Sequence, residues 1–422
     1  MLAYHAKTMH SYQSVRDGSH FMDWDHQPSS FKIYPEHFTR IPLHKTNPLH
    51  RFFILIGGLS AQKSYPGVTY SLRTNPSAGA LYPTEVYVQI KEVRGFEDGI
   101  YHLNQKEQAL VRLCSLAHDE GLEPLLHVKK ITGFLFLFST LYYRSSWKYR
   151  NRAFRYCLQD TGHMLGTLEA SCYLLDKSYH ILYDGDKQTL NQFFGFGKEE
   201  FFLSFACVGD EQPFTCKLPA THLDSCDGTH TFESNILVER AYESTFSLKK
   251  QPQMKMPHCT LDKDSYLKTI WNRRSIRDFN PSSAISQEHF QTIMEFITQP
   301  IPSDCDTRVD IYAVINRVEG LWRGLWKEGA YLKSGDFANL AGYLCLEQAL
   351  GAQSAVTFFL VGDESENYQA LMQKAGIIGH RLYLISNYLG IGCSGIGAYY
   401  DEEVATFLET EGMILYALVI GK

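Results

Sequence analysis

Gly162-His163-Met164-Leu165 and Gly379-His380-Arg381-Leu382 are two similar stretches that lie far apart in the chain. In and after each stretch, apolar residues recur at steps of three and four, which places them on one face of a helix. The residues with this spacing are Leu165, Leu168, Cys172 and Leu175 in the first segment, and Leu382, Ile385 and Leu389 in the second. A recurring helix of this kind indicates an internal repeat, and a repeat decides the architecture.

Short runs of β-branched and aromatic residues accompany both helical segments in the same order. Such runs are typical of strands. The matched pairs are residues 86–90 with 311–315, 134–138 with 358–361, and 203–209 with 415–421. The order strand, strand, long helix, strand therefore occurs twice, and it predicts two related α+β units.

The length and composition agree with two units. The chain has 422 residues, of which 44% are hydrophobic and 20% charged, and a domain usually contains about 100–200 residues. Proline and glycine are frequent between the two repeats, as in a linker. We expect an N-terminal arm at 1–48, a first unit at 49–210, a linker or covering arm at 211–261, and a second unit at 262–422.

Charge, cysteines and the N-terminus argue against several classes of protein. The formal net charge of -6 gives no reason to expect nucleic acid or an anionic membrane as a partner. The ten cysteines include no CxxC pair, so we predict reduced thiols, no metal site and no disulfide framework. No basic segment precedes an apolar run at the N-terminus, and the longest apolar stretch, 131–143, is shorter than the roughly 20 residues that span a bilayer. We expect a cytoplasmic protein.

The strongest local signal is Arg273-Arg274-Ser275-Ile276-Arg277. Three arginines and a hydroxyl lie within five residues. A guanidinium group offers a planar fork of donors that suits phosphate, and a serine adds a short hydrogen bond. The segment is therefore either a phosphate-binding site or a solvated basic face of a helix.

A second signal is the run Pro76-Ser77-Ala78-Gly79. Proline and glycine favour a rigid turn, and small side chains let a flat ring approach the backbone closely. The alternative is an ordinary loop before the strand predicted at 86–90.

A third signal is Gly390-Ile391-Gly392-Cys393-Ser394-Gly395-Ile396-Gly397, which contains the GxGxxG pattern of dinucleotide-binding proteins. That fingerprint requires a strand before it, whereas residues 381–389 have helical spacing. We therefore exclude a Rossmann site. A glycine-rich stretch after a helix can still present backbone N–H groups to the edge of a ligand ring.

Lys148 and Tyr149 are a candidate proton-transfer pair, because a desolvated lysine can be tuned towards neutral pH. The alternative is an exposed basic loop before the first long helix. His163 and His380 occupy equivalent points of the repeat, and we interpret them as helix-start histidines bonded to backbone rather than as metal ligands. The chain has no GxSxG elbow, which argues against a Ser-His-Asp hydrolase.

Together these motifs resemble the nitroreductase superfamily, and most closely its SagB-type (azoline oxidase-like) dehydrogenase branch. The family signature RRSxR matches residues 273–277, and the family turn PSAGALYP matches residues 76–83. The family helix that begins with Gly-His matches at both repeats, and the closing strand with its cation matches residues 415–422. The resemblance covers most of the chain. It implies tandem FMN-dependent nitroreductase-like units, with mostly antiparallel sheets flanked by helices, fused as an intramolecular pseudo-dimer.

The resemblance also implies one FMN held where two units meet, with RRSxR on the phosphate and the Pro-Ser turn on the ring. Only the second half has the arginine segment and the terminal cation, and only the first half has a well-formed turn; its counterpart is Pro302-Ser303-Asp304-Cys305. We therefore expect one complete site. Its cofactor-binding residues are Arg273, Arg274, Ser275, Arg277, Gly395, Ile396, Gly397 and Lys422 from one half, and Pro76, Ser77, Ala78 and Gly79 from the other.

Azoline oxidases carry a Lys-Tyr pair that acts in deprotonating the substrate ring, which implies that Lys148 and Tyr149 are catalytic. Arg150 follows this pair, where the family often has glycine. The implied reaction is hydride transfer between the flavin N5 and a small organic or peptide-derived substrate. Because the pseudo-dimer lies within one chain, the protein could act as a monomer. NAD(P)H is a candidate reductant.

Three other functions stay open at this point. The chain could be a generic NAD(P)H-dependent nitro- or quinone reductase. It could be a non-catalytic relative with a decayed flavin site that binds a peptide or a partner protein. It could also be an enzyme that consumes its own flavin.

Overall fold

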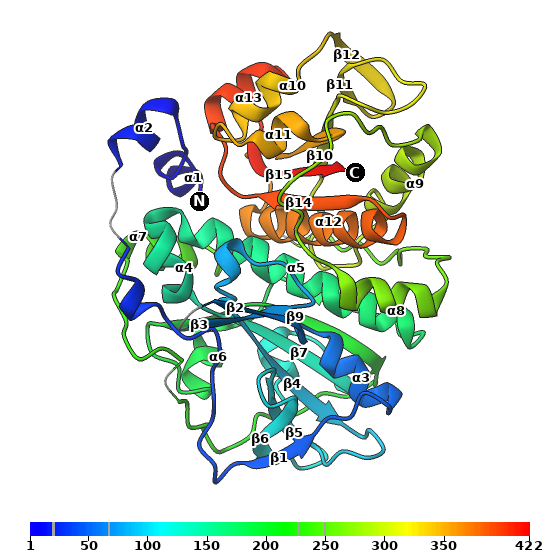
Figure 1. The fold of residues 1–422 in the computed structure, drawn as a ribbon. Coiled ribbons are helices and arrows are strands. Elements are labelled where there is room, and N and C mark those ends of the chain that lie inside the picture. The colour runs from blue at the N-terminus through cyan, green and yellow to red at the C-terminus, as the bar shows by residue number, and fades with distance from the viewer. Residues whose placement is uncertain (19–21, 66–67, 227, 249) are drawn as a thin grey trace. The chain divides into compact units, whose positions relative to one another are not determined.

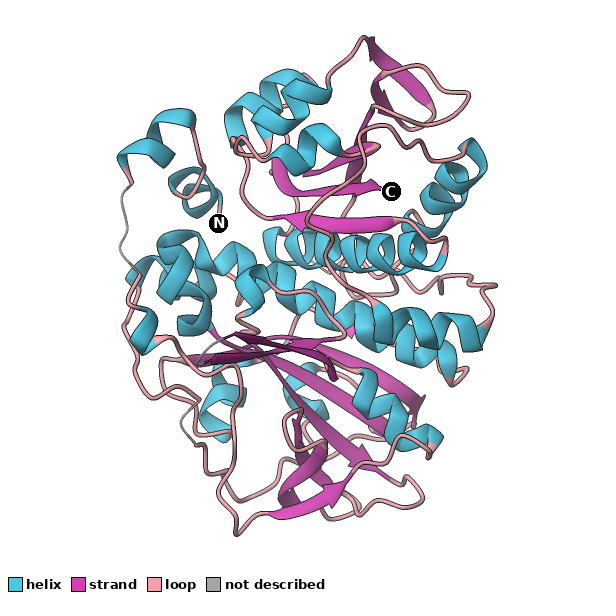
Figure 2. Ribbon diagram, in the orientation of Figure 1, coloured by secondary structure: helices cyan, strands magenta, loops and turns pink. Residues whose placement is uncertain are grey.

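The computed structural model describes residues 1–18, 22–65, 68–226, 228–248 and 250–422. The chain divides into two compact units (Figure 1). Unit 1 comprises Met1–Phe21, His258–Gln299 and Thr307–Lys422, and unit 2 comprises Met22–Pro257 and Pro300–Asp306. Both units combine a sheet with helices (Figure 2), so the α+β fold class predicted from the sequence is confirmed.

Unit 2 is built on a seven-stranded antiparallel sheet with the strand order β1-β6-β5-β4-β7-β9-β8. Its strands are β1 (Thr39–Pro42), β4 (Thr84–Lys91), β5 (Gly99–Asn104), β6 (Ala109–Ser115), β7 (Ile131–Leu141), β8 (His180–Leu182) and β9 (Glu200–Glu211). A separate hairpin of β2 (Leu59–Tyr65) and β3 (Val68–Arg73) leads into the predicted turn.

The helices of unit 2 range from single 3-10 turns to one very long α-helix. The α-helices are α3 (Pro48–Leu55), α4 (Tyr142–Tyr149), α5 (Ala153–Leu174), α6 (Lys187–Phe193) and α7 (Ile236–Glu243). The 3-10 turns are η1 (Trp24–His26), η2 (Ala78–Ala80), η3 (Glu123–Leu126) and η4 (Arg150–Arg152).

Unit 1 is built on a six-stranded antiparallel sheet with the strand order β12-β11-β10-β13-β15-β14. Its strands are β10 (Val309–Ile315), β11 (Gly324–Lys327), β12 (Ala330–Ser334), β13 (Val356–Gly362), β14 (Gly392–Ile396) and β15 (Met413–Gly421). Its helices are α1 (Leu2–Lys7), α2 (Tyr12–Asp17), α8 (Lys263–Asn272), α9 (Gln287–Ile297), α10 (Ala338–Leu344), α11 (Ala349–Gln353), α12 (Tyr368–Tyr388) and α13 (Asp401–Leu408).

The two sheets repeat one topology. The order β6-β5-β4-β7-β9-β8 in unit 2 corresponds strand by strand to β12-β11-β10-β13-β15-β14 in unit 1, and β1 is added at one edge of unit 2. The three strand pairs predicted from the sequence fall on β4 and β10, β7 and β13, and β9 and β15. The predicted internal repeat is therefore present in the fold.

The central strands are buried along their whole length. Every residue of β4 and of β13 is buried, and both strands are rich in β-branched and aromatic residues, which suit a pleated surface. Antiparallel pairing sets Tyr87 opposite Leu137 in unit 2 and Ile311 opposite Leu360 in unit 1. Full burial of such an apolar side chain stabilises a fold by roughly 1.5–3 kcal/mol, so these strands form the centre of each core.

A long helix packs on each sheet, α5 in unit 2 and α12 in unit 1, and most residues of both are buried. His163 and His380 lie in the middle of these helices, so their interpretation as helix-start residues was wrong. Both helices begin earlier, and their first two turns bury polar side chains such as Gln159 and Gln373, which hide the helix start from an apolar pattern. Within the described residues, none of the helices combines the length and the apolar character that a membrane span requires.

In the sequence, the short strands β8 and β14 come between the long helix and the last strand of each unit. The sequence analysis treated residues 390–397 as a glycine-rich stretch and predicted no strand there, and glycine is depleted in strands. β14 is nevertheless a strand, because all five of its residues pair with β15 at the edge of the sheet. Pairing with a neighbour therefore outweighed the local sequence preference.

Candidate functional site

The predicted arginine segment of unit 1 directly follows α8. The N–H of Ile276 donates to the carbonyl of Cys393 in β14 at 3.1 Å, and the N–H of Asn280 donates to the carbonyl of Lys422 at 2.6 Å. These two hydrogen bonds hold the segment along β14 and the end of β15.

Three predicted residues of unit 1 meet at Tyr383, a residue of α12 that the sequence analysis missed. The N–H of Gly395 donates to the Tyr383 hydroxyl at 2.6 Å, and the hydroxyls of Ser275 and Tyr383 are 2.9 Å apart. The guanidinium carbon of Arg273 lies 5.3 Å from the centre of the Tyr383 ring, within the range of a cation–π contact. Tyr383 therefore links the arginine segment to the glycine strand.

The cations of this region differ in exposure. The Arg273 side chain is buried, and its positive charge opposes the rise that burial causes in the pKa values of Tyr383 and Cys393. Arg277 and Lys422 are exposed. Among the residues that the structure describes, neither of these two side chains forms an ion pair. Both are thus available to an anionic ligand.

The remaining predicted residues of unit 1 have structural surroundings of their own. Arg274 turns back and donates to the carbonyl of Trp271 at 3.0 Å, at the end of α8. A Cβ atom at position 395 would collide with the hydroxyl of Tyr416, so a larger residue there requires the Tyr416 ring to move. Ile396 is buried at the end of β14, and Gly397 follows the strand.

The predicted turn of unit 2 has a strained backbone. The φ angles of Gly79, Ala80 and Tyr82 are 65°, 56° and 48°, and this left-handed region favours glycine over other residues. A Cβ atom built on Gly79 would lie 2.8 Å from the Tyr149 hydroxyl and 3.4 Å from the Lys148 Nζ. The turn therefore lies directly against the predicted proton-transfer pair.

Hydrogen bonds with two residues outside the turn, Asp160 and Arg144, hold it in place, and Pro76 at its start is buried. The Ser77 hydroxyl donates to the carboxylate of Asp160 at 2.5 Å and accepts the N–H of Tyr82 at 2.9 Å. The N–H of Ala78 donates to the other Asp160 oxygen at 3.3 Å. At the end of the turn, Arg144 donates to the Tyr82 carbonyl at 2.9 Å.

Two buried acids, Glu85 and Asp160, lie near the turn, and the sequence analysis missed both. Burial alone would raise the pKa of Glu85, but Arg144 at 2.6 Å and His102 at 2.9 Å hold it at about 2. Burial raises the pKa of Asp160 to about 7, although the two hydrogen bonds from the turn act in the opposite direction. No described cation contributes to the pKa of Asp160, and this distinguishes it from Glu85.

Lys148 and Tyr149 form the C-terminal end of α4. The Lys148 Nζ lies 5.6 Å from the centre of the Tyr149 ring and 5.8 Å from that of Trp24, and the Tyr149 ring packs on Tyr156 at 4.3 Å. Arg150 follows with φ 50° and ψ -129°, a conformation that favours glycine. The backbone therefore explains why glycine suits this position.

Trp24 is a further residue that the sequence analysis did not single out. Its side chain is 54% exposed and packs edge-on against Trp147, with ring centres 5.4 Å apart. The indole N–H of Trp147 donates to the Asp23 carbonyl at 3.2 Å. These contacts fix an exposed aromatic ring beside Lys148. The N-terminal arm has no periodic pattern, so the sequence carries no signal for this contact.

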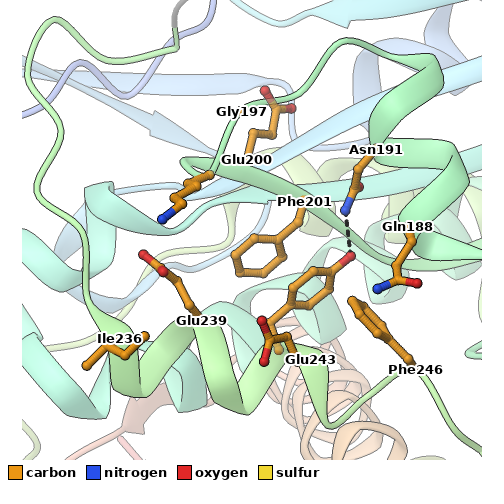
Figure 3. A pocket seen from close by; sticks show the side chains of 11 residues that line it. Gln188, Asn191, Gly197, Glu200, Phe201, Ile236, Glu239, Glu243 and Phe246 are labelled. Carbon is orange, nitrogen blue, oxygen red and sulfur yellow. Dashed lines mark hydrogen bonds between the residues drawn. The ribbon is translucent and has the colours of Figure 1, made fainter.

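A separate cavity of about 330 Å³ lies in unit 2 between α6, α7 and the start of β9 (Figure 3). The ring of Tyr242 stacks on Phe201 at 3.8 Å, and the side-chain amide of Asn191 donates to the Tyr242 hydroxyl at 2.8 Å. None of the predicted site residues lines this cavity. Its aromatic wall is held by contacts within the protein.

Most of the predicted site residues thus fall into two groups, one in each unit. We call the group in unit 1 the arginine cluster; it consists of Arg273, Ser275, Arg277, Gly395, Lys422 and the added Tyr383. We call the group in unit 2 the turn cluster; it consists of residues 76–79, Lys148, Tyr149 and the added Asp160. The arginine cluster offers cations and a hydroxyl to an anion. The turn cluster offers a tight backbone beside an amine and a phenol.

Comparisons with known proteins agree with this fold. The Nitroreductase family model matches residues 270–422, a segment that contains the arginine cluster. A protein of Methanocaldococcus jannaschii, provisionally named a nitroreductase, is 33% identical over 95 residues, which are 22% of this chain and 48% of that protein. The chain therefore spans about half the length of this curated relative.

Solved structures extend the similarity to the whole chain. A provisionally named nitroreductase from Anabaena variabilis superposes with a TM-score of 0.83 at 22% identity, covering 100% of this chain and 99% of that one. A microcin synthetase McbBCD complex of E. coli, with truncated pro-MccB17 bound, covers 48% of this chain and 81% of the other at 16% identity. Its TM-score of 0.32 is too low to carry an argument. The chain therefore has a nitroreductase-like α+β fold, and its residues 270–422 carry the sequence pattern of the nitroreductase family.

Proposed function

We propose that this chain is an FMN-dependent oxidoreductase that transfers hydride between the flavin N5 and a small organic or peptide-derived substrate. The observation that carries the proposal is the meeting of Arg273, Ser275 and Gly395 at Tyr383. Two sequence segments that resemble parts of one cofactor-binding pattern converge there in space. The match of residues 270–422 to the nitroreductase family supports the same conclusion.

The donor set of the arginine cluster fits a phosphate monoester. Guanidinium forks and a serine hydroxyl are strong donors to phosphate oxygens, and the side chains of Arg277 and Lys422 are exposed cations. Arg273 is held in place against Tyr383, so little entropy is lost when it contacts a ligand. Each charge-assisted hydrogen bond contributes roughly 1.5–3 kcal/mol, enough to make these residues the main anchor.

We assign the turn cluster to the ring of the same flavin, and this assignment rests on the sequence resemblance. Only unit 1 has the arginine segment, and only unit 2 has the complete turn. Small residues at positions 77–79 leave the backbone open to a flat ring. When bound, FMN would supply the redox chemistry, while the protein supplies position and electrostatics.

Lys148 and Tyr149 carry the finer proposal, a SagB-type dehydrogenation of an azoline-like ring. A substrate that gives up a hydride in this reaction must also give up a proton to become a neutral azole. The Tyr149 hydroxyl and the Lys148 Nζ both lie against Gly79, so either group can accept that proton at the turn when it is deprotonated, Lys148 as the free amine or Tyr149 as the phenolate. A general base of this kind contributes about 10²–10⁴-fold to a rate.

The test compares two reactions in one variant. We expect Lys148→Ala to keep the flavin spectrum, to lose about 10²–10⁴-fold in the oxidation of an azoline peptide, and to keep any NAD(P)H-driven reduction of a nitroaromatic. Lys198→Ala, which removes an exposed lysine of the same unit, should change neither rate. Steady NAD(P)H consumption with nitroaromatics, and no effect of Lys148→Ala on any reaction, would favour a generic nitro- or quinone reductase instead.

A non-catalytic binding protein is the rival from another class. A purified chain that is colourless, and that takes up no FMN on reconstitution, would support that rival and contradict the proposal.

A further inference from the structure

Asp160 is a buried acid that the proposed chemistry does not use. It lies within α5 and is 4% exposed. Its carboxylate accepts hydrogen bonds from Ser77 and Ala78, and the Cys157 thiol of its own helix is the titratable group that it influences. A carboxylate buried without a cation is costly and is retained where it holds something in place.

Glu85 provides an internal comparison. Both acids are buried near the turn, but Glu85 pairs with Arg144 and keeps its pKa at about 2, whereas burial raises the pKa of Asp160 to about 7. Acids whose surroundings drive their pKa values apart serve different purposes. Glu85 belongs to a permanent ion pair, and Asp160 changes charge near neutral pH.

The turn that Asp160 contacts is strained. Ala80 and Tyr82 are non-glycine residues with positive φ angles. Each such residue costs about 1–3 kcal/mol and persists only where surrounding contacts enforce the conformation. The Ser77 hydroxyl links Asp160 to the strained residue Tyr82, because it donates to the Asp160 carboxylate while it accepts the N–H of Tyr82. The carboxylate therefore closes a hydrogen-bonded loop around the strained residues.

We propose that Asp160, as a carboxylate, is the positioning residue that holds the turn of residues 77–82, with its left-handed residues Gly79, Ala80 and Tyr82, and thereby keeps the surface that contacts the flavin ring. The statement that the turn contacts a flavin rests on the proposed function. The statement that Asp160 holds the turn rests on the hydrogen bonds alone. It adds a regulatory property, because protonation of Asp160 removes the charge that strengthens both bonds.

The direction of the pH effect follows from the opposing causes of the pKa. The bonds from Ser77 and Ala78 lower the pKa of Asp160, so they are stronger with the charged form, while burial favours the neutral form. As the pH falls from 8 to 6, more Asp160 is protonated and the turn loosens. Flavin affinity should fall over the same range.

Hydrogen exchange of the flavin-free chain tests the turn directly. We expect the amides of Ala78 and Tyr82 to lose at least tenfold in protection factor in Asp160→Asn at pH 8, and to lose protection in the wild type between pH 8 and pH 6. The matched control is Asp304→Asn. Asp304 is also a buried acid of unit 2 with a raised pKa, and it accepts backbone N–H groups from Tyr183 and Asp184.

Unchanged protection of these two amides in Asp160→Asn, or an equal loss in Asp304→Asn, would overturn the inference and leave the proposed function standing. If Asp160→Asn does not fold, the wild-type pH series and Ser77→Ala decide, since Ser77→Ala should abolish the pH dependence at Tyr82. FMN titration of the same proteins then separates the two ideas. A loosened turn with unchanged FMN affinity would support Asp160 as the positioning residue and overturn the assignment of the turn to the flavin ring.

Discussion

The two units differ in the loop that follows a short helix packed on the long helix: the loop after α8 in unit 1 and the loop after α3 in unit 2. In unit 1, α8 packs on α12 and leads into Arg273 and Arg277; in unit 2, α3 packs on α5 and leads into Gly57 and Gly58. The same strand order surrounds both loops. One topology therefore carries cations in this loop in unit 1 and glycines in unit 2, so the loop and not the shared strand order sets the charge at this point of each unit.

The edge strands differ in the same sense. β14 brings Gly395 against the Tyr416 hydroxyl and Lys422 follows β15, whereas β8 sets Ile181 opposite Ala206 and β9 ends at Glu211. An anion would meet positive charge at the end of the last strand in unit 1 and negative charge in unit 2. The difference predicts an anion site in unit 1 alone.

The largest effect is expected when the cations that distinguish unit 1 from unit 2 are removed. Arg273→Ala with Arg277→Ala should weaken FMN binding by about 10²–10⁴-fold, since two charge-assisted bonds of roughly 1.5–3 kcal/mol each are lost. Flavin fluorescence titration measures the affinity. Arg323→Ala removes an exposed arginine of unit 1 that pairs with Asp336, and its FMN affinity should equal that of the wild type.

An unchanged FMN affinity in the double variant would show that the phosphate lies elsewhere. If the loss of buried Arg273 prevents folding, Arg277→Ala alone still decides, because this exposed side chain can be removed without opening the core.

A smaller effect is expected when the glycine at position 395 of β14 is replaced by a residue with a side chain, like those of the equivalent strand β8 in unit 2. Gly395→Ala should force the Tyr416 hydroxyl away and disturb the bond from Gly395 to Tyr383. We expect at least a tenfold loss of FMN affinity and a destabilisation of about 1–3 kcal/mol, typical of overpacking. Tyr416→Phe in the same chain should restore part of both. No rescue would mean that the collision is not the cause.

The turn of unit 2 allows a matched pair of glycine substitutions. Gly79→Ala places a Cβ 2.8 Å from the Tyr149 hydroxyl, whereas Gly95, with φ 96°, has open space around its Cβ position. Both changes carry the backbone cost of a left-handed alanine, roughly 1 kcal/mol. Only Gly79→Ala should lower kcat/KM, by about tenfold for a misplaced catalytic group. Equal activity losses in both variants would remove the turn from the site.

The smallest effect concerns stability and pH. The pKa of Asp160 is about 7 in the fold against an ordinary value of 3.8, so the native state holds the proton more tightly than the unfolded chain. Asp160 therefore favours folding below about pH 4, and this contribution is lost as the pH rises to 7. Asp160→Asn should be more stable than the wild type at pH 8, by roughly 1–2 kcal/mol, with a gap that narrows towards pH 4. A wild type that is the more stable protein in thermal unfolding at pH 8 would contradict this.

The repeat and its main strands could be predicted because their signals are local. The runs at β4 and β10 are dense in β-branched and aromatic residues, and the long helices carry apolar residues at helical steps. β8 and β14 could not be predicted in this way. β8 has three residues and β14 contains two glycines, and both exist because they pair with the last strand of their sheet.

The candidate site shows the same limit. The arginines and the turn stand out because their residue types are rare in such close spacing, whereas Tyr383 is one aromatic residue among many in a buried helix. Asp160 did leave a signal. It lies four residues before Met164 and eight before Leu168, so a charged group interrupts the apolar stripe of its helix. An acid on a buried face indicates a specific partner, here the Ser77 turn.

The number of FMN molecules bound per chain tests the difference between the units most directly. The flavin and protein of the saturated, purified chain are quantified by absorbance and amino-acid analysis. We predict one FMN per chain, because only unit 1 presents the arginine cluster and only unit 2 the complete turn. Two FMN per chain would contradict this, since a unit without the arginine cluster would then also hold a flavin phosphate.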